Sequence, residues 1–285
     1  MRRVAWHLPP TAKASKSPTP EIVIPSRRHR LARLDEIRSG FMSPAQLLVF
    51  GPHPDDIEIG MGGTIVRHAA RGVTVGLCDL TRGELGSNGT PDERLAEAEE
   101  ASKVLGAAWR VNLALPDGGL SLAREQRDAV IDLVRRTRPD VVAIPHGTDR
   151  HPDHVAAHAL LVRAVFDSGL RRILPGLEPW RPGRIFEYFI NDTGRPTVLV
   201  DVSDVYERKR AALACHRSQF TPDEQGAVAT RLTSPRFMQL IESRDRLFGA
   251  MAGVQAAEGF VSREPFMVDH LLPIGDSVAA LAPQP

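Results

Sequence analysis

Short apolar runs and amphipathic helical patterns alternate along the chain from residue 47 onward. Apolar runs of roughly four to eight residues, bounded by glycine, proline and polar turns, are typical of buried strands. These runs predict strands at 47–50, 73–80, 110–115, 141–144, 185–190 and 197–200. The patterns between and after them predict helices at 62–71, 91–105, 124–138, 158–166 and 206–218. This alternation predicts right-handed βαβ units, and hence an α/β fold with a mainly parallel sheet and helices on both faces.

Particular residues predict where one of these helices begins and ends, and which side chains of another are exposed. Thr90-Pro91-Asp92-Glu93 combines an N-cap, a proline at the first helical position and acids in the first turn, and Gly106 is a typical stop. In the last predicted helix, Lys209 and Arg210 are expected to face solvent. Prolines interrupt the stretch beyond Gly259, and no element is assigned to it.

Residues 1–41 differ from the rest of the chain. Prolines interrupt any periodicity there, and four arginines cluster at its end, namely Arg27, Arg28, Arg30 and Arg33. Such a cluster could bind an anionic surface or nucleic acid, but a flexible leader is the favoured interpretation. Because no repeat or low-complexity linker divides the remainder, we expect a flexible N-terminal extension over 1–41 and a single catalytic domain over 42–285.

Composition narrows the class of protein. The 36 Lys and Arg residues balance 35 Asp and Glu residues, and aromatic residues make up only 5%, so nucleic acid is not an expected partner. No run approaches the roughly 20 apolar residues of a membrane span, and the N-terminus lacks the apolar core of a secretory signal. Cys78 and Cys215 are too few for a disulfide framework and suit a reducing compartment. We therefore expect a cytoplasmic protein without a membrane partner.

The first stretch that carries chemistry is Gly51-Pro52-His53-Pro54-Asp55-Asp56, directly after the first predicted strand. Open α/β sheets bind ligands beyond the carboxyl ends of their strands. His53 and Asp56 offer a nitrogen and an oxygen from one short turn, and the prolines restrict the backbone that presents them. Asp55 lies between them in the sequence and should point elsewhere, which makes it available as a base.

A second such stretch, at 149–154, reads Asp-Arg-His-Pro-Asp-His and follows a later predicted strand. Zinc in hydrolytic sites usually takes three ligands from His, Asp or Glu and keeps a position for water. His154 would complete that set with the two side chains of the first motif. His151 would face the same site if a helix begins at Pro152, and Asp153 would orient one of the histidines.

These groups together predict metal-assisted hydrolysis. Zn²⁺, or Fe²⁺ with the same nitrogen and oxygen ligands, would lower the pKa of water toward ~7 and polarise a carbonyl. Asp55 would take a proton as water attacks. Protonated His151 would face the developing oxyanion and later protonate the leaving nitrogen.

Structural interpretations of the same residues are weaker. Either motif alone could be an ordinary turn in which an aspartate caps a helix, but two such motifs after two buried strands are hard to explain in that way. Gly60-Met61-Gly62-Gly63 does not match the G-x-G-x-x-G spacing of a dinucleotide site. The pattern therefore favours a metal site.

The polar loop after the strand at 73–80 offers candidates for substrate binding. Arg82, Asn88 and Arg94 lie in this glycine-rich loop or just after it. Arginine can pair a carboxylate through two parallel hydrogen bonds, so these residues could grip an anionic or polyhydroxylated substrate. For Arg82 a purely structural loop contact is equally compatible. Arg94 is the stronger candidate because its helix starts from the loop.

Five motifs carry a resemblance to a known family. They are G-P-H-P-D-D-I-E-I-G-M-G-G-T at 51–64, L-T-R-G-E-L-G-S-N-G-T-P-D-E-R at 80–94, N-L-x-L-P-D-G-G-L at 112–120, D-R-H-P-D-H at 149–154 and R-S-Q-F at 217–220. Over roughly residues 42–260 the chain resembles the LmbE/PIG-L family of zinc-dependent de-N-acetylases. The fourth and fifth motifs are similar to the bacillithiol-biosynthesis branch, whose enzymes remove acetate from N-acetylglucosaminyl malate.

The resemblance implies a role for each matching residue. The zinc ligands would be His53, Asp56 and His154. Asp55 would be the general base, with His151 as the electrophilic or acid partner that Asp153 orients. Arg94 would hold the substrate carboxylate, which is malate in that branch. The implied fold is a Rossmann-like, three-layer α/β sandwich that is often oligomeric.

Three functions remain open from the sequence. The favoured one is a zinc-dependent N-deacetylase acting on an N-acetylglucosamine conjugate, with N-acetylglucosaminyl malate as the first candidate. The second is the same chemistry on another amide, such as a mycothiol precursor, a chitooligosaccharide or another small-molecule conjugate. The third is a nucleotide- or sugar-binding protein without hydrolytic activity, which would bind no metal. The expected partner is thus a small amino-sugar conjugate, and a homo-oligomer is compatible with the resemblance.

Overall fold

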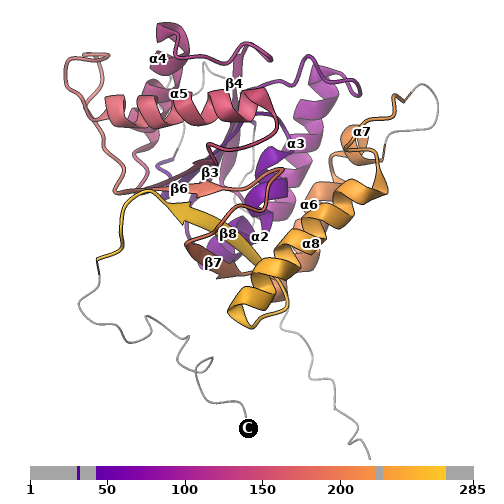
Figure 1. The fold of residues 1–285 in the computed structure, drawn as a ribbon. Helices are drawn as coiled ribbons and strands as arrows, with labels where there is room; N and C mark the ends of the chain where they lie inside the picture. Colours follow the sequence, from indigo (N-terminus) through magenta and orange to yellow (C-terminus); the bar gives the residue numbers. More distant parts are fainter. Residues whose placement is uncertain (1–30, 33–42, 222–226, 268–285) are drawn as a thin grey trace, which may run out of the picture.

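The computed structural model describes residues 31–32, 43–221 and 227–267. A single sheet with the strand order β1-β4-β3-β2-β5-β6-β8-β7 runs through the molecule, and helices cover both of its faces (Figure 1). The strands are β1 (Leu31–Ala32), β2 (Leu47–Gly51), β3 (Val75–Thr81), β4 (Trp109–Leu115), β5 (Val141–Pro145), β6 (Arg184–Tyr188), β7 (Val198–Asp201) and β8 (Ala257–Ser262). The helices are α2 (Asp56–Ala70), α3 (Pro91–Leu105), α4 (Arg124–Thr137), α5 (Pro152–Ser168), α6 (Tyr206–Ala214), α7 (Arg217–Phe220), α8 (Pro235–Ala252) and the 3₁₀ helix η1 (Ser203–Val205). The predicted α/β class and mainly parallel sheet are confirmed.

The order of the strands places both sequence motifs at one edge of the sheet. From β2 the chain moves outward through β3 and β4, and it then returns to β5 on the other side of β2. The order of the strands therefore reverses between β2 and β5, where open α/β sheets form their ligand crevice. The motif at 51–56 leaves the carboxyl end of β2, and the motif at 149–154 follows β5.

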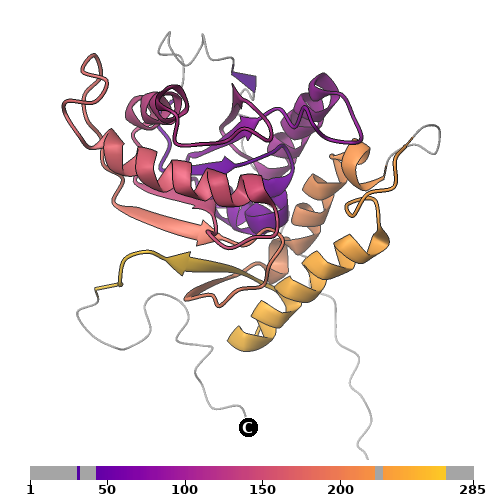
Figure 2. The same cartoon turned by 45° about the horizontal axis from the view of Figure 1, so that its top comes forward.

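The core divides into two apolar layers, one on each face of the sheet. Along β2, Leu47 and Val49 pack in the layer under α2, whereas Leu48 and Phe50 pack in the layer under α4 and α5. This alternation follows from the two-residue period of a strand. Figure 2 shows α5 on one side of the sheet and α8 on the other. Because both faces are covered, the carboxyl edge is where a polar site can open to solvent.

Several predicted boundaries shift in the structure. Helix α2 begins at Asp56 rather than at residue 62, and it kinks at Met61, whose φ is −149°. Helix α5 begins at Pro152, the condition under which His151 was expected to face the site. The N-cap predicted at Thr90 is confirmed, because its side chain and that of Glu93 form a reciprocal capping box.

The prediction that Lys209 faces solvent is wrong. Its side chain is completely buried, and Nζ lies 2.6 Å from Asp245 and 2.7 Å from Glu258. These two partners come from α8 and β8, elements that were not predicted. Glu258 interrupts the apolar pattern of β8, and its pairing with a buried lysine, together with hydrogen bonds from two backbone N–H groups, makes it compatible with a strand in the core.

Strand β8 also gives the sheet its antiparallel part, since it runs antiparallel to both β6 and β7. Within 1–41, the predicted extension, the structure describes only the two residues of β1, which pair in parallel with β4. The rest of that prediction lies outside the described residues. Among the helices that the structure describes, none combines the length and apolar character that a bilayer crossing needs.

Candidate metal centre and active site

A cavity of about 460 Å³ opens at the carboxyl ends of β2 and β5. Its lining includes every predicted metal and catalytic residue, namely His53, Asp55, Asp56, His151, Asp153 and His154. The loop after β3 and the segment before α8 complete its walls. The topology therefore brings two stretches of sequence about a hundred residues apart into one site.

The turn after β2 presents two neighbouring carboxylates in different directions. Asp55 has a φ of 121°, a left-handed conformation that costs energy for a residue other than glycine and is often found at functional sites. Asp56 is the first residue of α2, and its Oδ2 accepts a hydrogen bond from the backbone N–H of His53 at 3.0 Å. The strained turn thus gives the carboxylates of Asp55 and Asp56 different partners.

The three predicted metal ligands converge on one point. Oδ2 of Asp56 lies 3.1 Å from Nδ1 of His53 and 3.2 Å from Nε2 of His154. One candidate ligand atom from each residue lies within 4.8 Å of the other two, and all three residues are buried. A tetrahedral ion with bonds of about 2.0–2.1 Å holds its ligand atoms roughly 3.3 Å apart. The donor set and its spacing therefore fit a divalent ion such as Zn²⁺.

Each histidine of this set uses its second ring nitrogen to contact a carboxylate. Nε2 of His53 lies 3.0 Å from Oδ1 of Asp117, and Nδ1 of His154 lies 3.2 Å from Oδ2 of Asp149. Metal-binding histidines commonly donate their other N–H to a carboxylate, which fixes the ring and the tautomer. Asp117 and Asp149 were not among the predicted site residues, although both lie in motifs that the sequence displays.

The carboxylates around His53 and His154 favour positive charge on both rings. Burial alone would lower the pKa of His154, but Asp56 and Asp149 raise it to about 9. Burial likewise opposes protonation of His53, yet hydrogen bonds with Asp117 and other carboxylates raise its pKa well above the usual value. Both shifts show that the buried carboxylates favour positive charge at this point. A dication bound by the same atoms would supply the same charge.

Asp55 is held by Arg94. Burial raises the pKa of Asp55 to about 6, and the guanidinium of Arg94 opposes this shift. Nη2 of Arg94 donates to Oδ2 of Asp55 at 3.2 Å and to the carbonyl oxygen of Pro54 at 3.0 Å, while Nη1 donates to the carbonyl oxygen of Gly83 at 3.0 Å. Arg94 therefore binds both the turn and the carboxylate of the candidate base, and it also lines the cavity.

His151 and Asp153 begin helix α5 beside the ligand set. The backbone N–H of Asp153 donates to Nδ1 of His151 at 3.2 Å, so the neutral ring carries its proton on Nε2. Burial and the neighbouring imidazoles lower the pKa of His151. The Asp153 carboxylate contacts Nε2 of His53 at 3.3 Å and accepts from the Gly118 N–H at 2.8 Å. The hydrogen bond of its side chain is thus with His53 rather than with His151.

The other two predicted substrate-binding residues are not among those that line the cavity. Nη2 of Arg82 lies 2.5 Å from Oδ1 of the exposed Asp92. Both polar groups of the Asn88 side chain bind the backbone of Val228, at 2.9 and 2.8 Å. Neither Arg82 nor Asn88 lines the cavity. Asn88 instead anchors the segment that leads to α8.

The motif at 217–220 supplies a cavity residue for which the sequence had suggested no role. Nε2 of Gln219 donates to the carbonyl oxygen of Asn88 at 2.7 Å and to Oγ of Ser218 at 3.0 Å. Ser218 in turn donates from its N–H and Oγ to Glu97 of α3, at 2.8 and 2.7 Å. These bonds fix Gln219 in the wall of the cavity.

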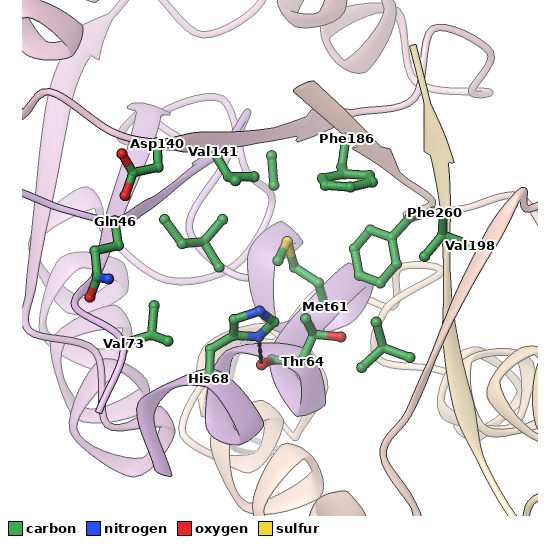
Figure 3. A pocket seen from close by; sticks show the side chains of 13 residues that line it. Gln46, Met61, Thr64, His68, Val73, Asp140, Val141, Phe186, Val198 and Phe260 are labelled. Atoms are coloured by element: carbon green, nitrogen blue, oxygen red, sulfur yellow. Dashed lines mark hydrogen bonds between the residues drawn. The ribbon is translucent and has the colours of Figure 1, made fainter. Parts of the chain in front are cut away.

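A second cavity, of about 300 Å³, lies between α2 and the amino ends of the central strands. Figure 3 shows Met61, Phe186 and Phe260 around it, with Gln46 and Asp140 toward one end. None of the predicted site residues is among the described residues that line it. The candidate chemistry therefore belongs to the first cavity.

Comparison with known proteins agrees with this geometry. Residues 48–165 match the family described as PIG-L: GlcNAc-PI de-N-acetylase. A diacetylchitobiose deacetylase of Thermococcus kodakarensis is 31% identical over 259 residues, which cover 85% of this chain and 92% of that protein. The chain belongs to the PIG-L family. The resemblance to the LmbE/PIG-L family is thereby confirmed, and the chain is a member of a deacetylase family.

Two further proteins are similar to this chain. A 1D-myo-inositol 2-acetamido-2-deoxy-alpha-D-glucopyranoside deacetylase of Saccharopolyspora erythraea is 30% identical over 239 residues, covering 65% of this chain and 87% of that protein. The solved structure of the conserved protein TT1542 from Thermus thermophilus is 44% identical, with a TM-score of 0.71. That alignment covers 79% of this chain and 97% of the other. The two relatives named as deacetylases act on acetylated amino sugars.

Proposed function

We propose that this PIG-L protein is a metal-dependent N-deacetylase that hydrolyses the acetamide of an N-acetylglucosamine conjugate to acetate and a free amine. The observation that carries the proposal is the convergence of His53, Asp56 and His154 beside Asp55 in an open cavity. A Zn²⁺ or Fe²⁺ ion held by those three side chains would polarise the acetamide carbonyl and lower the pKa of a nearby water.

The chain's own residues complete the hydrolysis. Asp55 accepts a proton from the water whose oxygen attacks the carbonyl carbon, and it returns that proton to the nitrogen as the C–N bond breaks. His151 donates its Nε2–H to the oxygen on which negative charge develops. This role uses the neutral ring, which the bond from the Asp153 N–H to Nδ1 favours.

Arg94 acts on the base rather than on the substrate in this proposal. Its contacts with Asp55, Pro54 and Gly83 fix the direction of the Asp55 carboxylate. These bonds are made by Nη1 and Nη2, whereas Nε has no hydrogen-bond partner among the described residues. The described contacts of Arg94 are with Asp55 and the turn, so the argument for a malate aglycone rests on the motif resemblance alone.

Two kinds of conjugate are therefore proposed as substrates. N-acetylglucosaminyl malate follows from the motifs at 149–154 and 217–220. A conjugate with a second ring, such as diacetylchitobiose or N-acetylglucosaminyl inositol, is favoured by the names of the relatives in Thermococcus kodakarensis and Saccharopolyspora erythraea.

A substrate panel tests the proposal. Metal-loaded protein is incubated with the three conjugates, and free amine and acetate are measured in equal amounts if the amide is cleaved. Asp55→Asn serves as the matched control, because it keeps the size of the side chain and removes the base. Metal bound in the protein without turnover of any acetylated amino sugar would reject the deacetylase. Absence of bound metal in elemental assays would favour the non-hydrolytic binding protein.

Other expectations from the sequence stay predictions. They are the flexible extension over 1–41, the single catalytic domain over 42–285, the homo-oligomer and the cytoplasmic location. Cys78 and Cys215 are both free thiols, with Cys78 buried in the core. Light scattering of the full chain would measure the oligomeric state.

A further inference from the structure

We propose that Asp117 is a positioning residue that ties the metal ligand His53 to the loop that lines the substrate cavity, an inference that rests on the proposed function. Asp117 follows β4, and its two carboxylate oxygens have different partners. Oδ1 lies 3.0 Å from Nε2 of His53, and Oδ2 accepts a hydrogen bond from the N–H of Leu85 at 2.8 Å.

The contact with His53 fixes a metal ligand from outside the ligand set. His53 follows β2 and Asp117 follows β4, so their contact links the ends of two strands that are not neighbours in the sheet. Only 7% of the Asp117 side chain and 11% of the His53 side chain are exposed. Because Nδ1 of His53 faces Asp56, the Nε2–H is left to donate to Asp117.

The contact with Leu85 fixes a wall of the cavity. Leu85, Gly86 and Ser87 of this loop all line the cavity, and Leu85 is 72% exposed at its mouth. Such a position suits contact with the part of a substrate that extends beyond the acetylated sugar. A second carboxylate reinforces the same loop, since Glu84 accepts from the N–H groups of Asp117 and Arg82, both at 3.1 Å.

The turn after β4 is shaped for this approach. Gly118 has a φ of +68°, and a Cβ there would lie 2.8 Å from Cδ1 of Leu85. Asp153 also lies near Nε2 of His53, but at 3.3 Å, and its other contact is with the Gly118 N–H. Asp117 therefore lies closer to Nε2 of His53 than Asp153 does. Of these two carboxylates, Asp117 is also the one that accepts from the N–H of Leu85.

The Asp117 side chain thus contacts both a metal ligand and the loop in the cavity wall. If the metal orients His53, the Asp117 carboxylate is oriented as well, and so is the N–H of Leu85 that it accepts from. Coupling between two binding sites is reciprocal, so a substrate that stabilises the loop should also raise the affinity of the site for the metal. Removing the carboxylate should weaken metal binding even when no substrate is present.

Asp117→Asn and Glu84→Gln separate the two halves of the proposal. Asparagine has a single acceptor oxygen for two donors, so His53 and Leu85 no longer both have an acceptor. Glu84→Gln perturbs the same loop without touching His53. Zinc affinity is measured by competition with a chromophoric chelator, and kcat and KM are measured at saturating zinc on the conjugate that the panel identifies.

We expect Asp117→Asn to weaken zinc binding by about 10- to 100-fold and Glu84→Gln, which acts on His53 only through Asp117, to weaken it by a much smaller factor, while both raise KM. Equal zinc affinity in Asp117→Asn and wild type would overturn the inference, as would an equal loss in Glu84→Gln. Circular dichroism and melting in chelator verify that each apoprotein is folded, and Asp117→Ser replaces the asparagine variant if it is not. Wild-type protein without zinc affinity would overturn the proposed function as well, whereas zinc binding without amide turnover would overturn that function alone.

Discussion

Nη2 of Arg94 lies 3.2 Å from Oδ2 of Asp55, and both side chains are almost completely buried. The arginine comes from the first turns of α3, and the aspartate comes from the strained turn that begins α2. A buried ion pair of this kind fixes the direction of the Asp55 carboxylate, because a change of geometry would leave both charges buried without their partner. This relationship changes the expected consequence of replacing Arg94.

Arg94→Lys should lower kcat on every substrate rather than on carboxylated ones alone. Lysine keeps the charge but cannot reach Asp55, Pro54 and Gly83 with the planar fork of a guanidinium. We expect kcat to fall by about 10- to 100-fold, part of what a positioned base contributes. Steady-state kinetics on N-acetylglucosaminyl malate and on diacetylchitobiose measure the effect. Arg82→Lys, on the exposed pair with Asp92, is the matched control and should stay near wild type. A loss of activity confined to the malate conjugate would instead indicate that Arg94 binds the substrate carboxylate.

Metal retention should separate the ligands from the base. His154→Ala removes a nitrogen from the buried set, so purified protein should contain much less zinc by elemental measurement. Asp55→Asn leaves His53, Asp56 and His154 in place, and it should retain zinc while turnover falls by about 10²- to 10⁴-fold. Retention of stoichiometric, tightly held zinc by His154→Ala would refute the proposed ligand set. Loss of zinc from Asp55→Asn would make Asp55 a ligand rather than the base.

The candidate metal ligands come together through features that the sequence displays. His53 and Asp56 lie in one turn after a strand, and strand order at the sheet edge then brings His154 to them. The partners of Arg94 and Asp117 could not be predicted in this way. Their contacts depend on how the segments that follow β2, β3 and β4 pack against one another, and no local sequence pattern determines that packing.

The same limit applies to the fold. Apart from β1, the parallel strands were predicted because each is a run of apolar residues with turn signals around it. Helix α8 and strand β8 were missed, and Lys209 was wrongly placed on the surface, since in each case a tertiary partner decides the outcome. Glu258 accepts from the N–H groups of Gly63 and Thr64 at 2.9 and 2.7 Å and pairs with Lys209, a burial that only the assembled fold explains.

Lys209→Met should destabilise the fold strongly. The change leaves Asp245 and Glu258 buried without their shared cation, and breaking such a pair typically costs about 3 to 5 kcal/mol. Denaturant unfolding at neutral pH measures the loss. Arg210→Met is the matched control one residue along the same helix, where the side chain is half exposed and its ion pairs lie at 3.4 to 3.5 Å. It should change the unfolding free energy by less than about 0.5 kcal/mol. Equal effects in the two variants would contradict the role of the buried cluster.

Glu58 should make stability depend on pH in the acid range. Burial would raise the pKa of this carboxyl, but Arg110 and His216 lower it from 4.5 to about 2. Oε1 of Glu58 lies 2.6 Å from Nη1 of Arg110, inside the core. Because the folded pKa is below the unfolded one, the ionised group stabilises the native state above about pH 4.5. That contribution is lost as pH falls from about 4.5 to about 2.

Glu58→Gln removes the titrating group and nearly keeps its shape. At neutral pH it should lower the unfolding free energy by about 3 kcal/mol, the value of a shift of this size. The difference between wild type and variant should stay constant from pH 8 to about pH 5 and shrink at lower pH. Urea unfolding of both proteins at a series of pH values measures it. A difference that persists unchanged below pH 4 would mean that the variant loses packing rather than charge, because packing does not titrate with Glu58.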